Sequence, residues 1–357
     1  MPKVLLTGGS GFIAAHILDI LLARGYDVVT TVRSKAKGDA IFAAHPGIQR
    51  QKLSYVTVED VAEDGAFDEV STLQPRDPPI ELQSLTVNVA QAVKSNPPLD
   101  YVIHTASPFH SNFTDPIKEL LNPAINGTTG ILRAIKAYAP TVRRVVITSS
   151  FAAIANSVST PKVYDESSWN PVTWEEAVTE PVQAYRGSKT FAEKAAWKFV
   201  ETENPHFDLA TMNPPLVYGP VVHDLNSLDN LNTSNQRIRD FIQGKCTDDV
   251  LPPTGTFLWT DVRDLALAHV RAIEVPEAGG KRFLVTAGLY SMKRLVDAIR
   301  QTHPELSSKL PKNPVDDTPA NIYGYDNSRA TQLLGINFRT LEMSVQDTVA
   351  SLLKIST

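Results

Sequence analysis

The sequence predicts an α/β protein with a doubly wound parallel sheet and a second, smaller C-terminal α/β lobe. Two observations lead to this prediction: short apolar runs alternate with helical patterns through the N-terminal half, and a glycine-rich turn joins the first run to the first helical pattern. Alternating strands and helices build a parallel sheet with helices on both faces, and right-handed crossovers wind it in two directions.

The first strand and helix show the pattern clearly. After the apolar run at residues 4–7, apolar residues recur at helical spacing (Ile13, Ile17 and Ile20) until Gly25 stops the helix. The expected strands are 4–7, 28–32, 53–58, 101–104, 142–148 and 209–212, the last running into two prolines. The expected helices are 12–24, 61–73, 128–138 and 184–201.

The C-terminal part is richer in loops. Its expected helices are 234–243, 261–273 and 292–301, with one strand at 283–286. We expect residues 1–212 to form the sheet domain, with a return segment near 255–275. Residues 213–357 would mainly form a smaller lobe over the carboxyl edge of the sheet, where ligands bind in such folds.

Composition excludes several classes of protein. The 357-residue chain has 42% hydrophobic and 20% charged residues and a formal net charge of −5, so it lacks the basic surface that nucleic acids or anionic membranes attract. No apolar run approaches the ~18 residues that span a bilayer. Cys246 is the single cysteine, which agrees with a reducing compartment. We expect a cytoplasmic monomer or homodimer, without a metal because no His/Cys cluster exists.

The turn at residues 7–14 has the pattern of a dinucleotide site. Gly8, Gly11 and Ala14 are spaced so that the turn is tight, the backbone can approach a pyrophosphate, and helix packs on strand. The context of strand, turn and helix predicts a Rossmann-type cofactor domain. The turn residues expected at the cofactor are Thr7, Gly8, Gly11, Phe12 and Ile13.

The end of the second strand favours NADP(H) over NAD. An NAD site has an acidic residue there, but this chain has none before Asp39. Arg33 instead offers a guanidinium for a 2′-phosphate, and Lys37 or Lys35 could add a second cation. The competing interpretation is a solvated basic loop.

Tyr185 and Lys189 are the candidate reactive pair. At positions i and i+4 of a helix they share a face, and a cation beside a phenol favours the phenolate. Ordinary helix faces carry the same spacing by chance. Ser149 and Ser150 follow the strand at 142–148 and add hydroxyls at its carboxyl end.

The turn, the two serines and the Tyr/Lys pair together resemble the short-chain dehydrogenase/reductase superfamily, and the length resembles its extended branch. The segments 145–153, 165–171 and 184–197 are similar to those of fungal NADPH-dependent methylglyoxal, aldehyde and ketone reductases, relatives of plant dihydroflavonol reductases. The resemblance implies hydride transfer from NADPH to an aldehyde or ketone. It implies that Tyr185 donates the proton, Lys189 binds the nicotinamide ribose, and Ser150, rather than Ser149, bonds the carbonyl oxygen.

The resemblance also implies further site residues. Those matching the cofactor cleft are Asp60, Val61, Ala106, Ser107, Pro214 and Leu216. Those matching the substrate pocket are Phe109, Phe151, Ala155, Val182, Leu216 and Tyr218. Ala155 replaces an aromatic residue of a relative, which suggests room for a bulkier substrate. Asn126 would join a proton relay or cap a helix.

Residues 74–98 depart from the resemblance. Prolines bracket an expected helix at 80–94, and about twenty residues look inserted relative to the family's connection here. A surface excursion and a cover over the adenine end of the cofactor both remain open.

An NADPH-dependent carbonyl reductase is therefore the predicted function. One alternative is an NAD-containing sugar-nucleotide epimerase or dehydratase of the same superfamily. The other is a non-catalytic NADP-sensing regulator, although such proteins typically lose the tyrosine or the lysine, and this chain keeps both.

Overall fold

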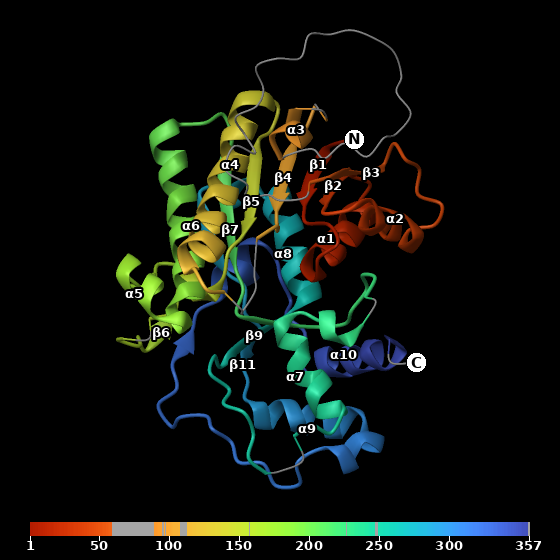
Figure 1. Cartoon of the computed structure of the whole chain (residues 1–357), viewed down its shortest axis with the longest axis vertical. Coiled ribbons are helices and arrows are strands. Elements are labelled where there is room, and N and C mark those ends of the chain that lie inside the picture. The colour runs from red at the N-terminus through yellow and green to blue at the C-terminus, as the bar shows by residue number, and fades with distance from the viewer. Residues whose placement is uncertain are drawn as a thin grey trace.

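A computed structural model describes residues 1–58, 89–94, 96, 98–107, 113–156, 158–225, 227–246 and 249–355. Its main feature is a seven-stranded parallel sheet with the strand order β10-β7-β5-β4-β1-β2-β3, which confirms the predicted doubly wound α/β class (Figure 1). The strands are β1 (Lys3–Thr7), β2 (Asp27–Val32), β3 (Leu53–Thr57), β4 (Tyr101–His104), β5 (Arg144–Thr148), β7 (Asp208–Asn213) and β10 (Lys281–Leu284).

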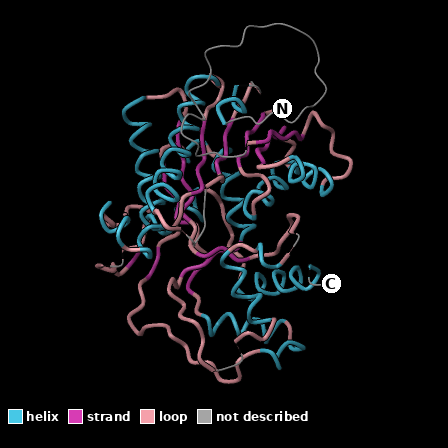
Figure 2. Tube along the Cα trace, in the orientation of Figure 1, coloured by secondary structure: helices cyan, strands magenta, loops and turns pink. Residues whose placement is uncertain are grey.

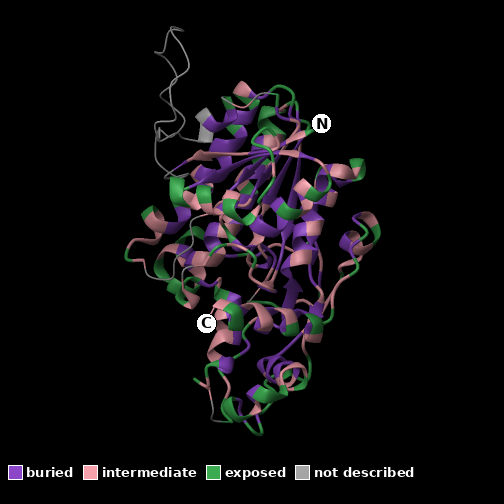
Figure 3. Cartoon of the chain, turned by 90° about the vertical axis from the view of Figure 1, so that its right-hand side faces the viewer, coloured by how far each residue is buried: buried purple, intermediate pink, exposed green. Residues whose placement is uncertain are grey.

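Helices cover both faces of this sheet (Figures 1 and 2). The helices that pack with the sheet domain are α1 (Phe12–Ala23), α2 (Lys35–Ala44), α3 (Val89–Lys94), α4 (Asn122–Tyr138), α6 (Pro181–Glu203) and α8 (Val262–Glu274). Successive residues of β1 serve the two faces. Val4 and Leu6 pack with α1 and α8, whereas Leu5 packs with α3 and α4. This alternation follows from the period of two in a strand, and most strands of the sheet are buried (Figure 3).

A smaller lobe has its own apolar core. It contains the strands β8 (Leu216–Tyr218), β9 (Leu258–Asp261) and β11 (Gly288–Leu289), and the helices α7 (Thr233–Ile242), α9 (Met292–Thr302) and α10 (Leu341–Ile355). Two further short elements, α5 (Trp174–Thr179) and β6 (Val163–Tyr164), lie beside α6 (Figure 1). The strand β6 pairs with β12 (Gly324–Tyr325).

The two parts of the fold interleave along the chain. Helix α8 packs against α1, and β10 pairs in parallel with β7 at the edge of the large sheet. The placement of residues 283–286 in the smaller lobe is therefore wrong. A strand's apolar run does not show which sheet edge it will join, because the pairing partner is more than sixty residues away.

The helices differ from the sequence expectations in two further ways. Helix α2 was not predicted; its amphipathic signal is weak, and its most evident local marker is Ser34, whose hydroxyl caps Lys37 N. The expected helix at 61–73 and most of the one at 80–94 lie outside the described residues, where α3 is the described end of the latter. No helix in the described part of the chain is long and apolar enough to cross a membrane.

Gly187 allows α5 and α6 to approach each other closely. A Cβ at this position would collide with the Cβ of Ala177. We expect the overpacking in Gly187→Ala to cost roughly 1–3 kcal/mol. This cost exceeds the ~1 kcal/mol by which alanine is favoured over glycine in a helix, so the free energy of unfolding should fall. Thermal unfolding measures the change, and Gly187→Ala/Ala177→Gly, which restores the space, is the control. An unchanged or raised Tm in the single variant contradicts this account.

Candidate active site

The site forms where neighbouring parallel strands end. Strands β4, β5 and β7 pair in register, so their carboxyl ends meet at one edge of the sheet. Ser149 and Ser150 continue from β5, and Asn213 ends β7. Helix α6 crosses beside this edge and carries Tyr185 and Lys189 on one face.

The structure brings together the three predicted catalytic side chains. The hydroxyl of Ser150 is hydrogen bonded to the phenol of Tyr185, a residue that is half-buried. The Nζ atom of Lys189 lies 5.9 Å from the centre of the Tyr185 ring. The same Nζ donates a 2.8 Å hydrogen bond to Oγ of Ser107, one of the residues expected in the cofactor cleft. Tyr185 and Lys189 are therefore held in one site, and not on an ordinary solvent-facing helix surface.

Burial controls the protonation of this pair. It raises the pKa of Tyr185 above the usual value, and the hydrogen bond with Ser150 acts in the opposite direction. It also lowers the pKa of Lys189 to about 8. The net direction for Tyr185 is opposite to the shift toward phenolate that the spacing predicted, because desolvation is the largest influence on the phenol. At neutral pH Tyr185 is a phenol with a proton to donate, and Lys189 is mostly charged.

Ser149 and Ser150 have different environments, which supports the choice between them. Ser149 is buried, and its hydroxyl donates a 2.5 Å hydrogen bond to Oε2 of Glu193. The hydroxyl of Ser149 is therefore engaged inside the protein. Ser150 is half-buried and faces Tyr185.

The glycine turn has the conformation that the sequence predicted. Gly8 has a φ of +75°, which favours glycine, and its N–H donates to Oγ1 of Thr31 at 3.0 Å. Gly9 was missed. It packs so closely against Thr30 on β2 that no Cβ fits there. No side chain caps α1 at Gly11 and its first turn contains no acidic residue, so the helix N-terminus is open to an anion.

Thr7 acts within the protein framework. It is fully buried, and its Oγ1 accepts hydrogen bonds from the N–H groups of Thr105 and Ala106 at 3.2 Å. Its hydroxyl also contacts Nδ1 of His104 at 2.9 Å, and burial lowers the pKa of this histidine to about 4. His104 is therefore neutral at pH 7, and its ring shares a hydrogen bond with the hydroxyl of Thr7. The side chain of Thr7 ties β1 to β4 and has no exposed surface.

Phe12 and Ile13 likewise contribute to packing. Phe12 is buried and Ile13 half-buried, and both pack in the core between the sheet and α1. Their side chains pack with the helix that follows the turn, and their contact with the cofactor stays a prediction.

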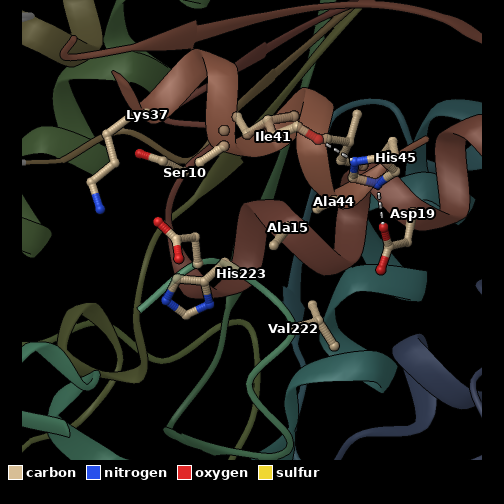
Figure 4. Close-up of a pocket in the computed structure, with 13 residues that line it drawn as sticks. Ser10, Ala15, Asp19, Lys37, Ile41, Ala44, His45, Val222 and His223 are labelled. Atoms are coloured by element: carbon tan, nitrogen blue, oxygen red, sulfur yellow. Dashed lines mark hydrogen bonds and ion pairs between the residues drawn. The ribbon is translucent and has the colours of Figure 1, made fainter. Parts of the chain in front are cut away.

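A pocket lies between α1, α2 and the loop after β8 (Figure 4). Ser10, Lys37 and His223 line it, from three separate parts of the chain. Arg33 is exposed just before α2, whereas Lys35 is held by Asp39 at 2.6 Å. Lys37 lines the pocket and Lys35 does not, which favours Lys37 as the second cation.

His223 was not predicted as a site residue. Its Nδ1 atom is buried and has no hydrogen-bond partner among the described residues. Burial, with the nearby His16 and Lys37, lowers its pKa to about 4. The pocket combines three features: the unpaired Nδ1 atom of His223, the uncapped start of α1 and the ammonium of Lys37. Together they fit a phosphorylated dinucleotide. No local pattern marks His223, since it lies about two hundred residues after the turn it faces.

The predicted pocket residues divide into core and surface. Phe151 is 4% exposed and its ring meets that of Tyr164 edge-on at 5.1 Å. Tyr218 is fully buried in the smaller lobe and donates to the hydroxyl of Tyr290 at 3.2 Å. Tyr218 is therefore a core residue, and its assignment as a pocket wall is wrong because no surface of it is accessible.

The other predicted residues are less enclosed. Ala155 and Leu216 are half-buried, Pro214 accepts a 2.8 Å hydrogen bond from the Phe151 N–H, and Val182 is 74% exposed on the first turn of α6. Val182 does not line an enclosed wall. The predictions for Asp60, Val61 and Phe109 lie outside the described residues.

Asn126 lies inside α4, directly after a π-helical turn at Ile117–Leu121. Its interpretation as a helix cap is wrong, since the helix begins at Asn122. A role in a proton relay stays a prediction. The described residues contain no group of three or more metal-ligating side chains, and burial raises the pKa of Cys246, which makes it a poor nucleophile.

Comparisons with known proteins agree with this geometry. Residues 4–286 match the NAD dependent epimerase/dehydratase family. The ketoreductase AzaE of Aspergillus niger is 50% identical over 99% of this chain and 98% of its own length. The NADPH-dependent methylglyoxal reductase GRE2 of Saccharomyces cerevisiae is 36% identical over 99% of this chain and 98% of its length.

A solved structure extends the likeness to three dimensions. Gre2 of Candida albicans in complex with NADPH has a TM-score of 0.85 and 37% identity, with all of both chains covered. A family match over most of the sequence, with relatives similar over its whole length, means that this chain belongs to the extended short-chain dehydrogenase/reductases.

Proposed function

We propose that this protein is an NADPH-dependent carbonyl reductase that converts aldehydes or ketones into alcohols. The observation that carries the proposal is the meeting of Ser150, Tyr185 and Lys189 at the carboxyl edge of the sheet. The ketoreductase and methylglyoxal reductase named among its relatives support the same reaction class. A cytoplasmic monomer or homodimer is the form we propose, with residues after 212 mainly supplying the substrate-facing lobe.

Each side chain of the site has a chemical role in this reaction. Bound NADPH supplies a hydride to the carbonyl carbon. Tyr185 donates its phenolic proton to the carbonyl oxygen, and the hydroxyl of Ser150 bonds the same oxygen as charge develops. Lys189 stabilises the phenolate left on Tyr185, which then recovers a proton from solvent. A phenol with a raised pKa is suited to give up its proton only when that oxygen becomes basic.

The cofactor would be held by the turn at residues 7–14 and by the basic end of β2. The open N-terminus of α1 suits the pyrophosphate. Arg33 and Lys37 suit a 2′-phosphate, and no acid stands where an NAD site has one. Purified protein holding tightly bound NAD would instead favour an epimerase or dehydratase.

We expect Tyr185→Phe to reduce turnover of ketones by about 10²- to 10⁴-fold, because general acid catalysis by the phenol is lost. NADPH affinity should stay within a few-fold, as measured by fluorescence titration. Tyr138→Phe removes a phenol outside the site, beside Lys94, and serves as the control. A Tyr185→Phe enzyme as active as the parent excludes this mechanism, and a parent without turnover on any carbonyl favours the regulator.

The pH dependence should report Lys189. Its pKa is lowered to about 8, so the ammonium is present below that pH and is lost as pH rises through it. We expect the rate of reduction at saturating NADPH to fall above about pH 8. Rates in overlapping buffers from pH 6 to 10, on enzyme shown to remain folded, measure this. A flat profile to pH 10 contradicts the assignment.

Cofactor choice should depend on Arg33 and Lys37. A charge-assisted hydrogen bond contributes about 1.5–3 kcal/mol, so Arg33→Ala or Lys37→Ala should weaken NADPH binding roughly tenfold or more. NADH binding should change little, because it has no 2′-phosphate. Lys35→Ala is the matched control, since that ammonium is paired with Asp39. Equal losses for both cofactors would contradict 2′-phosphate recognition.

A further inference from the structure

A buried carboxylate continues the reactive face of α6. Glu193 follows Lys189 at i+4 and Tyr185 at i+8, and only 2% of it is exposed. Its two oxygens accept five hydrogen bonds. The donors are Ser149 Oγ at 2.5 Å, Asn213 Nδ2 at 2.7 Å, Arg282 Nε at 2.7 Å, Thr211 Oγ1 at 2.9 Å and Trp197 Nε1 at 3.3 Å.

Trp197 lies on α6 itself, and the other four donors lie in or directly after three strands of the sheet. Ser149 follows β5, Thr211 and Asn213 belong to β7, and Arg282 belongs to β10. The carboxylate therefore fixes α6 against the edge at which the site forms. These hydrogen bonds offset the free-energy cost of burying the carboxylate, which would be high if its oxygens had no partners.

Arg282, the charge that balances Glu193, is equally well satisfied. It is 7% exposed, and its NH1 donates to the backbone oxygens of Glu166 at 2.8 Å and Ser168 at 2.7 Å. Its guanidinium lies 3.6 Å from the centre of the Trp169 ring. The ion pair thus joins α6 and β10 to the segment at residues 166–169.

The contacts of Glu193 converge on Ser150. Ser149, which bonds Oε2, is the preceding residue in the chain. Asn213 donates from the same Nδ2 atom both to Oε2 and, at 3.2 Å, to the backbone oxygen of Ser150. One carboxylate oxygen therefore holds both segments that border Ser150, while its own helix carries the phenol that Ser150 bonds.

We propose that Glu193 is a positioning residue, which, with Arg282, sets the height of α6 along the sheet and so aligns Tyr185 with Ser150. This inference rests on the proposed reductase function. Glu193 touches neither of the predicted reacting groups. Its effect should therefore appear in the chemical step and not in binding of NADPH, whose predicted phosphate contacts lie at the turn before α1 and around the start of α2.

Glu193→Gln tests this directly. An amide keeps the size but turns one acceptor into a donor, which then faces side chains that are themselves donors. We expect kcat for ketone reduction to fall about 10- to 100-fold, as for a misplacement near 1 Å, with the KM for NADPH changed less than about threefold. Arg282→Lys, which keeps the charge but loses the guanidinium contacts, should give a smaller loss of kcat of the same kind.

Glu166→Gln is the matched control. Glu166 is also a buried carboxylate, and it accepts from the N–H of Leu284 on β10 at 3.1 Å; in the described part of the chain its side chain has no hydrogen bond or ion pair with α6. We expect it to lower Tm without the fall in kcat. If Glu193→Gln does not fold, the kcat of Arg282→Lys tests the positioning role by itself.

Two outcomes would overturn the inference: an unchanged kcat in these variants, or equal losses in kcat and NADPH affinity. A parent enzyme that reduces no carbonyl would instead overturn the proposed function, so the two failures are distinguishable.

Discussion

The parallel pairing of β1, β4, β5 and β7 is the constraint on which the rest of the structure depends. Because parallel strands all end at the same edge, the residues that follow them meet there even when the chain separates them by a hundred positions. The glycine turn after β1, Ala106 and Ser107 after β4, and Ser150 after β5 are assembled in this way. Helix α6 then needs only the correct height along the sheet to complete the site.

Buried polar bonds hold these strand ends in place. Thr7 and His104 connect β1 with β4, and Glu193 connects α6 with β5, β7 and β10. Each group is desolvated and finds its partners within the protein. Such bonds have directions and lengths, so they fix relative positions more narrowly than apolar packing does.

Desolvation also decides the chemistry of the reactive pair. It keeps the proton on Tyr185 and brings the pKa of Lys189 to about 8. From spacing alone, the ammonium of Lys189 is the expected main influence on the pKa of Tyr185. In the folded protein, loss of hydration is the largest influence on the pKa of each group.

The sequence by itself determined the fold class, most elements of the sheet domain, the glycine turn and the Tyr185–Lys189 pair. These features depend on local periodicity and on residues within a few positions of each other. The tertiary structure alone decided that residues 281–284 join the large sheet, that Tyr218 is core, and that His223, Glu193 and Arg282 surround the site. The physical reason is that these depend on contacts between distant segments: Glu193 and Arg282 are 89 positions apart, and no local pattern contains their pairing.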